Sequence, residues 1–169
     1  NVHVAILDTG VDDTHPDWRL ETITIDAAYG GERLPLYLLL PKGRQPPYQS
    51  VVWMPFAAAW DARTSPPIND NAAFSFLAKS GRAVVFPVYK GSYQRGTKEY
   101  NGGDQLKSSN IWRDYILMFA KDIGRTIDYL ETRPDFDRSR IGYFGYSRGA
   151  ALSPIFLANE SRFRAAAVW

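Results

Sequence analysis

One short stretch constrains this chain more than any other: Gly145-Tyr146-Ser147-Arg148-Gly149, a serine set between two glycines. It follows a strand-like apolar run at residues 140–144 and precedes a helix-like segment at residues 150–159. Glycine adopts backbone conformations that other residues avoid, so the two glycines permit a sharp turn between strand and helix. A serine at such a turn is strained and exposed, as a nucleophilic hydroxyl must be. The alternative is an ordinary glycine-rich turn from strand to helix.

Size and composition indicate a globular chain. Its 169 residues suit one domain, and 45% of them are hydrophobic, including 14% aromatic residues. The 20 basic and 18 acidic residues leave a net charge of +2, with no run of five like charges. We therefore expect no nucleic-acid partner and no membrane-surface partner.

The chain lacks cysteine. This excludes disulfides, thiolate metal sites and a cysteine nucleophile, and it leaves the compartment open. No cluster of metal-ligand residues stands out, so we predict neither a metal nor a cofactor. We also find no signal peptide and no apolar run near 18 residues, and we expect a soluble protein.

Strand-like and helix-like segments alternate along the chain. Strands are predicted at residues 2–7, 20–27, 34–40, 50–55 and 82–88, of which 20–27 is half-buried and 50–55 and 82–88 are buried. A helix is predicted at residues 71–79, capped by Asn69 or Asp70. Residues 8–18 are interpreted as a loop. The pattern predicts an α/β fold, with helices on both faces of a mostly parallel sheet and antiparallel leading strands.

The strongest helix is predicted at residues 111–131. Its apolar residues recur at 3.6-residue spacing: Ile111, Trp112, Tyr115, Ile116, Phe119, Ile123, Ile127 and Leu130. We place Asp122 and Arg125 on the polar side of this helix, as a structural ion pair.

Residues 19–169 resemble the α/β-hydrolase fold, in its prolyl-oligopeptidase-like and acetyl-esterase-like branch. The resemblance is carried by residues 34–41, 51–55 and 83–89, by the helix at 122–134 and by the Gly145 to Gly149 motif. It implies an incomplete α/β-hydrolase sandwich, because in the family further strands carry the catalytic acid and then the histidine. It also implies that Ser147 attacks an ester and forms an acyl-enzyme.

Residues 1–18 resemble a different family, the subtilisin-like proteases. Asp8, inside Val4-Ala5-Ile6-Leu7-Asp8-Thr9-Gly10, matches the position of the triad acid there, and His15-Pro16-Asp17 follows. The histidine and serine motifs of subtilases are absent, so a subtilisin fold is excluded. The two resemblances together suggest a chimera, with a subtilase-like segment at residues 1–18 and a hydrolase-like domain at residues 19–169.

A serine needs a base, normally a histidine that a carboxylate orients. No histidine or aspartate follows Ser147, and the chain has two histidines, His3 and His15. His15 lies among aspartates, so we predict a catalytic set of Ser147, His15 and Asp8, assembled within one chain or between two. The alternative is that His15 is a loop residue outside any triad, and His3 is expected at the surface.

Two backbone N–H groups are needed to stabilise the oxyanion. We predict those of Arg148, directly after the nucleophile, and of Ala57, in the loop after residues 50–55. Relatives usually carry glycine where this chain has Phe56, and the alanine-rich run can equally be the start of a helix.

The predicted function is hydrolysis of small or short-chain esters at a low rate, because the triad is incomplete. The rival prediction is a catalytically inactive scaffold that oligomerises. Under either, a sheet that stops after Trp169 exposes an edge strand, so we expect a homodimer or larger homo-oligomer.

Overall fold

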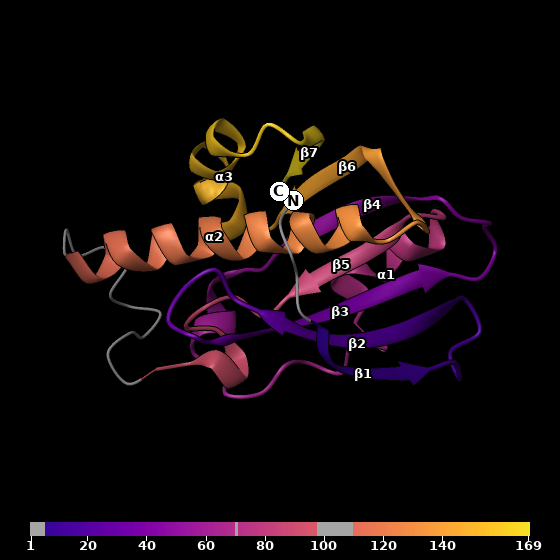
Figure 1. Ribbon diagram of the computed structural model, residues 1–169, viewed down its shortest axis with the longest axis horizontal. Helices are drawn as coiled ribbons and strands as arrows, with labels where there is room; N and C mark the ends of the chain where they lie inside the picture. The colour runs from indigo at the N-terminus through magenta and orange to yellow at the C-terminus, as the bar shows by residue number, and fades with distance from the viewer. Residues whose placement is uncertain (1–5, 70, 98–109) are drawn as a thin grey trace.

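The computed structural model describes residues 6–69, 71–97 and 110–169 (Figure 1). One seven-stranded sheet runs through this part of the chain, in the order β1-β2-β3-β5-β4-β6-β7. The strands are β1 (Ile6–Asp12), β2 (Trp18–Asp26), β3 (Arg33–Pro41), β4 (Tyr48–Met54), β5 (Ala83–Pro87), β6 (Phe136–Gly145) and β7 (Phe163–Val168). The α-helices are α1 (Ala72–Lys79), α2 (Asn110–Thr132) and α3 (Arg148–Asn159), with 3-10 turns η1 (Ala57–Trp60) and η2 (Tyr93–Arg95).

The sheet has an antiparallel and a parallel part. Strands β1, β2, β3 and β5 pair antiparallel, whereas β5, β4, β6 and β7 pair parallel. Short turns join the antiparallel strands, such as the β2–β3 turn with Gly30 and Gly31 at φ 61° and 62°. Parallel neighbours need a crossover, and helices supply it. The predicted antiparallel leading strands are confirmed.

Helices cover both faces of the sheet. In Figure 1, α2 crosses in front of the strands beside α3, and α1 lies behind them. Helix α1 begins one residue after Asn71, whose side chain accepts a hydrogen bond of 2.9 Å from the N–H of Ala73. The predicted cap at Asn69 is wrong, because the side-chain amide oxygen of Asn69 instead accepts a 3.1 Å hydrogen bond from the Trp18 indole N–H. The alternative cap, Asp70, lies outside the described residues. None of the helices in the described ranges is long and apolar enough to cross a bilayer.

The first described strand extends further along the chain than the predicted strand at residues 2–7, and it takes up the first part of the predicted loop at residues 8–18. Residues Ile6–Asp12 form β1 and pair with residues 20–25 of β2. Residues 8–12 have weak strand character, but backbone hydrogen bonds to the β2 edge stabilise their extended conformation. Residues 6–12 are thus one strand of the common sheet, and His3 lies outside the described residues.

The opposite edge of the sheet is β7. From Arg164 to Val168 its residues are exposed, and Trp169 just after it is 77% exposed. An edge strand of this kind presents unpaired N–H and C=O groups along one side. Among the described residues, β7 pairs with β6 alone.

Helix α2 supplies a test of the core. Phe119 is fully buried and its ring lies 5.4 Å from that of Trp60, whereas the neighbouring Leu117 is 54% exposed. We expect Phe119→Ala to lower the free energy of unfolding by about 3–5 kcal/mol. Leu117→Ala should change it by about 0.5 kcal/mol or less. Urea denaturation measures the free energy of unfolding of both variants. Equal losses would contradict the burial of Phe119 and the exposure of Leu117.

Candidate active site

Ser147 occupies a strained turn between β6 and α3. Its φ is 54° and its ψ is −103°, and its side chain is exposed. A positive φ is unusual for a residue with a Cβ and costs on the order of 1–3 kcal/mol. The strained, exposed serine that the sequence predicts is therefore present in the structure.

Neighbouring strands hold this turn by backbone hydrogen bonds. The N–H of Tyr146 donates to the carbonyl of Met54 on β4 at 3.1 Å. The N–H of Ser147 donates to the carbonyl of Trp169 at 2.5 Å, and Trp169 donates back to Gly145 at 2.9 Å. Strands on both sides of β6 thus fix the conformation that the serine would not adopt alone.

The two glycines are needed for space. A Cβ on Gly149 would run into the carbonyl of Met54, coming within 2.9 Å of its carbon. A Cβ on Gly145 would lie 2.5 Å from the carbonyl oxygen of Gly149. Backbone freedom is the reason predicted for these two glycines, but the positive φ belongs to Ser147 between them. Close packing of backbone on backbone is the physical reason for the motif.

The turn that holds Ser147 lies at the point in the sheet where the strand order changes direction. From β4 the chain continues through α1 to β5 on one side, and β6 pairs on the other. Ser147 follows the carboxyl end of β6, and Ala57 follows that of β4, beside it. In open α/β sheets, ligands bind in the crevice outside these strand ends.

Both predicted oxyanion donors begin helices. Arg148 is the first residue of α3, and Ala57 is the first residue of η1. The first N–H groups of a helix have no partner within that helix, and they attract negative charge. The alternative prediction, that the alanine run begins a helix, is also confirmed. A helix that begins at Ala57 is compatible with a hydrogen bond from the Ala57 N–H to the oxyanion.

Aromatic side chains surround the serine. The ring of Phe56 contacts that of Tyr146 edge-on at 5.6 Å, and the Trp169 ring lies 5.2 Å from Tyr146. The Arg148 guanidinium is buried 5.0 Å above the Trp60 ring. Phe56, which departs from the family pattern, therefore forms part of the wall beside the nucleophile.

The structure does not bring His15 to Ser147 within the chain. His15 lies in the β1–β2 turn, where its ring stacks on Trp18 at 3.4 Å. Trp18 pairs with Pro41, at the amino end of the parallel strands, whereas Ser147 follows their carboxyl ends. The His15 Nδ1 accepts the N–H of Asp17 at 3.2 Å, so this ring nitrogen is engaged within its own turn.

Asp8 is equally remote. Its backbone pairs with Thr24 in β1, at the other edge of the sheet from β7. Five strand spacings separate β1 from β6, which is about 24 Å at about 4.8 Å each. Ser147, Arg148 and Ala57 are thus adjacent in the fold, and His15 and Asp8 are not near them.

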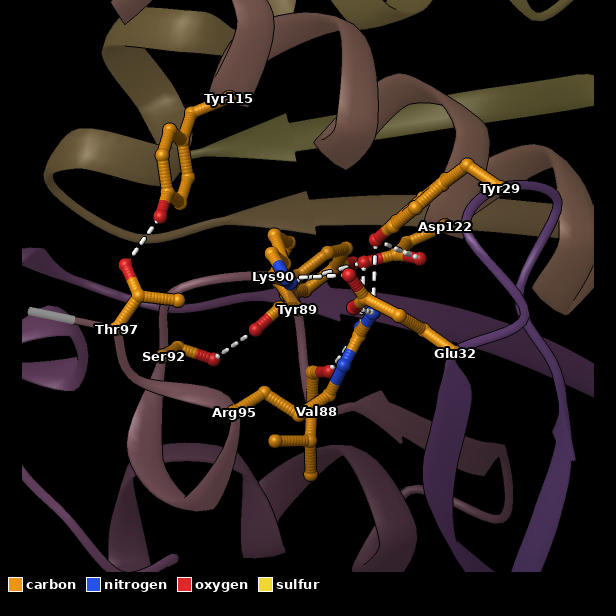
Figure 2. A network of polar contacts seen from close by, with 10 residues as sticks. All are labelled: Tyr29, Glu32, Val88, Tyr89, Lys90, Ser92, Arg95, Thr97, Tyr115 and Asp122. Atoms are coloured by element: carbon orange, nitrogen blue, oxygen red, sulfur yellow. Dashed lines mark hydrogen bonds and ion pairs between the residues drawn. The ribbon is translucent and has the colours of Figure 1, made fainter. Parts of the chain in front are cut away.

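A buried polar network lies behind the loop that follows β5 (Figure 2). The Asp122 carboxylate, fully buried on α2, accepts hydrogen bonds from the Tyr29 hydroxyl at 2.8 Å and the Lys90 N–H at 2.9 Å. Arg95 of η2 pairs with the same carboxylate at 2.7 Å and donates to the carbonyl of Val88 at 2.8 Å. The network fixes residues 88–95 against α2.

The charges of this network alter the pKa values of its members. Burial raises the pKa of Asp122, although Arg95 opposes the shift. For Glu32, burial would raise the pKa, but hydrogen bonds and charge from Lys90 and Arg95 lower it overall. Lys90 reaches Glu32 at 2.5 Å, so the β2–β3 turn is bound to the same loop.

The predicted ion pair of Asp122 with Arg125 on the polar side of α2 is wrong, because Asp122 is fully buried and pairs with Arg95. Arg125 does not pair with Asp122; it contacts Asp128 at 3.7 Å and the carbonyl of Asp26 at 3.0 Å. Asp122 lies three residues after Phe119 and one before Ile123, so helical spacing already puts it on the buried face. That spacing was the signal that could have found it.

Groups of three or more His, Cys, Asp or Glu side chains that could hold a metal ion are absent from the described residues. No protein-family model matches the sequence, and a comparison with curated proteins gives no match.

Several of the solved structures that share this fold are named as esterases. The acetyl xylan esterase from Paenibacillus sp. R4 aligns with a TM-score of 0.69 at 20% identity, over 98% of this chain and 52% of that one. Acetyl xylan esterase 1 from Thermoanaerobacterium sp. JW/SL YS485 gives 0.67 at 14%, over 98% and 51%. The glucuronoyl esterase from Solibacter usitatus gives 0.65 at 14%, over 96% and 50%.

These alignments define the fold as that of the α/β-hydrolases. The chain spans about half the length of each of these structures. The alignment with the first of these structures covers 98% of this chain, so it extends into residues 1–18. Residues 6–12 form β1 and residue 18 begins β2, so both ends of this segment belong to the common sheet.

Gly149→Ala tests the backbone packing. A Cβ there meets Met54, so we expect a loss of about 1–3 kcal/mol in the free energy of unfolding. Gly124→Ala in α2 is the matched control, because its Cβ would meet atoms at 3.8 Å or more and should stabilise by up to about 1 kcal/mol. Chemical denaturation gives both values. A neutral Gly149→Ala would contradict the close packing.

Glu32→Gln tests the charges of the network. Because the folded-state pKa of Glu32 is lowered from 4.5, its contribution is fully present above that value and is lost as pH falls through the lowered pKa. The wild type should therefore lose more thermal stability than the variant as pH falls below about 4.5. Melting temperatures measured from neutral to acidic pH show this. Parallel curves for the two proteins would refute it.

Proposed function

We propose that this chain carries the nucleophile of a serine ester hydrolase. Ser147 Oγ attacks the ester carbonyl, and the N–H groups of Arg148 and Ala57 stabilise the tetrahedral oxyanion. Collapse expels the alcohol and leaves an acyl group on Ser147, which water then removes. The single observation that carries this proposal is the strained, exposed Ser147 at the carboxyl end of β6.

The base is the open part of the proposal. His15 and Asp8 of the same copy are remote from Ser147, so a contribution from them requires a second copy of the chain. The structures that share the fold are about twice as long, so a base from polypeptide outside these residues is the other source. Without a base, a rate on the order of 10³–10⁴-fold over water is expected.

The substrate class proposed is small or short-chain esters. Two of the structures that share the fold are named acetyl xylan esterases, and the third is named a glucuronoyl esterase. All three names describe cleavage of esters, which agrees with a nucleophilic serine.

A second candidate is an inactive scaffold that oligomerises. It is favoured by the exposed edge of β7 and by the separation of His15 from Ser147. Sheet extension at β7 would join two copies under either function.

Labelling distinguishes the two functions. We expect a fluorophosphonate to label the wild type at Ser147 and not Ser147→Ala, because Ser147 is exposed at a helix N-terminus. Hydrolysis of p-nitrophenyl acetate should fall to background in Ser147→Ala. Mass spectrometry locates the label, and an unlabelled but folded wild type would favour the scaffold.

Mixing experiments locate the base. If His15 acts across two copies, His15→Ala alone is inactive, and a mixture of His15→Ala with Ser147→Ala regains activity. If the base lies elsewhere, His15→Ala hydrolyses p-nitrophenyl acetate at the wild-type rate. The two outcomes exclude each other.

A further inference from the structure

An apolar cavity of about 460 Å³ opens near the carboxyl ends of the parallel strands, where Ser147 also lies. Its walls come from the segment after β4, from the first turn of α1 and from η2. Phe56, Ala62, Pro66, Ala73 and Tyr93 give it an apolar lining. Among the described residues that line it, none carries a charge.

The cavity shares a wall with the candidate active site. Phe56 and Ala58 both line it, and they flank Ala57, the proposed oxyanion donor. The ring of Phe56 also contacts Tyr146 at 5.6 Å, and Tyr146 directly precedes Ser147. A group in the cavity would therefore lie next to the segment that holds the ester carbonyl.

The walls are held in place by buried contacts. Tyr93 is 5% exposed and belongs to η2, whose Arg95 is bound to Asp122. Asn71 caps α1 through the N–H of Ala73, which fixes the opposite wall. A preformed apolar pocket with few polar groups is the usual form of a small-molecule site, and such sites measure about 300–1,000 Å³.

We propose that this cavity binds the apolar group of the ester substrate, an alkyl or aryl group larger than acetyl. The inference rests on the proposed function and narrows its substrate class. An acetyl group would leave most of the cavity empty, whereas a chain of six carbons would bury several methylenes. Each buried methylene strengthens binding by about fourfold.

Chain-length dependence of labelling tests the proposal. Fluorophosphonates with ethyl and hexyl groups are compared on the wild type, Ala73→Phe and Ala72→Phe. Ala73 lines the cavity, whereas the adjacent Ala72 is exposed and is the matched control. We expect the hexyl probe to label the wild type at least tenfold faster than the ethyl probe. Ala73→Phe should abolish this preference, and Ala72→Phe should keep it.

A second cavity-filling variant keeps the test valid if Ala73→Phe does not fold. Ala62→Phe fills the cavity from the segment after η1 and should also abolish the hexyl preference. Melting curves identify any variant that is unfolded. Equal rates for the two probes on the wild type, or a preference that survives in both folded cavity variants, would overturn the proposal.

Binding without chemistry separates this inference from the proposed function. 1-Hexanol is titrated into Ser147→Ala and followed by amide NMR of residues 56–66. Saturable shifts there, lost in the Ser147→Ala/Ala73→Phe double variant, support the cavity even if no fluorophosphonate reacts. Labelling at Ser147 without saturable hexanol shifts would support the proposed function and overturn the cavity assignment.

Discussion

The carboxylate of Asp122 joins segments that are far apart in the sequence. It receives hydrogen bonds from the turn after β2, at Tyr29, and from the loop after β5, at Lys90 and Arg95. Removing one member of a buried charged pair typically costs about 3–5 kcal/mol, because the other charge stays buried and unpaired. The same loop bonds to β4 through Tyr89, whose hydroxyl donates to the carbonyl of Trp53 at 2.9 Å. The network thus supports the segment next to the proposed oxyanion loop.

The serine depends on backbone contacts more than on side chains. Its turn is held between the carbonyls of Met54 and Trp169, and Gly149 packs directly on β4. Such contacts leave little freedom for the turn to relax. They explain how a residue with a Cβ keeps a φ of 54° in a folded chain. They also fix Ser147 relative to the first residue of η1, so the proposed nucleophile and oxyanion donors are positioned by the sheet itself.

Local patterns predicted most of the fold, and long-range contacts account for what they missed. Residues 145–149 and the apolar face around Phe119 indicated the serine turn and the long helix, because close sequence spacing determines both. The full extent of β1 could not be predicted, since residues 8–12 are extended through pairing with β2 rather than by their own composition. The partner of Asp122 is Arg95, 27 residues away, and no periodic pattern reports such a pair. The distance from His15 to Ser147 likewise depends on strand order.

The hydrogen bond from Ser147 to the carbonyl of Trp169 has a consequence for biosynthesis. Trp169 follows the serine by 22 residues, and β7 must pair with β6 before its carbonyl reaches the turn. Chains emerge from the ribosome amino end first, at about 5–20 residues per second. Before β7 has been synthesised, the nascent chain can assemble strands β1 to β6, but the N–H of Ser147 lacks its acceptor, the carbonyl of Trp169. The serine turn therefore takes its final geometry only after β7 has paired with β6.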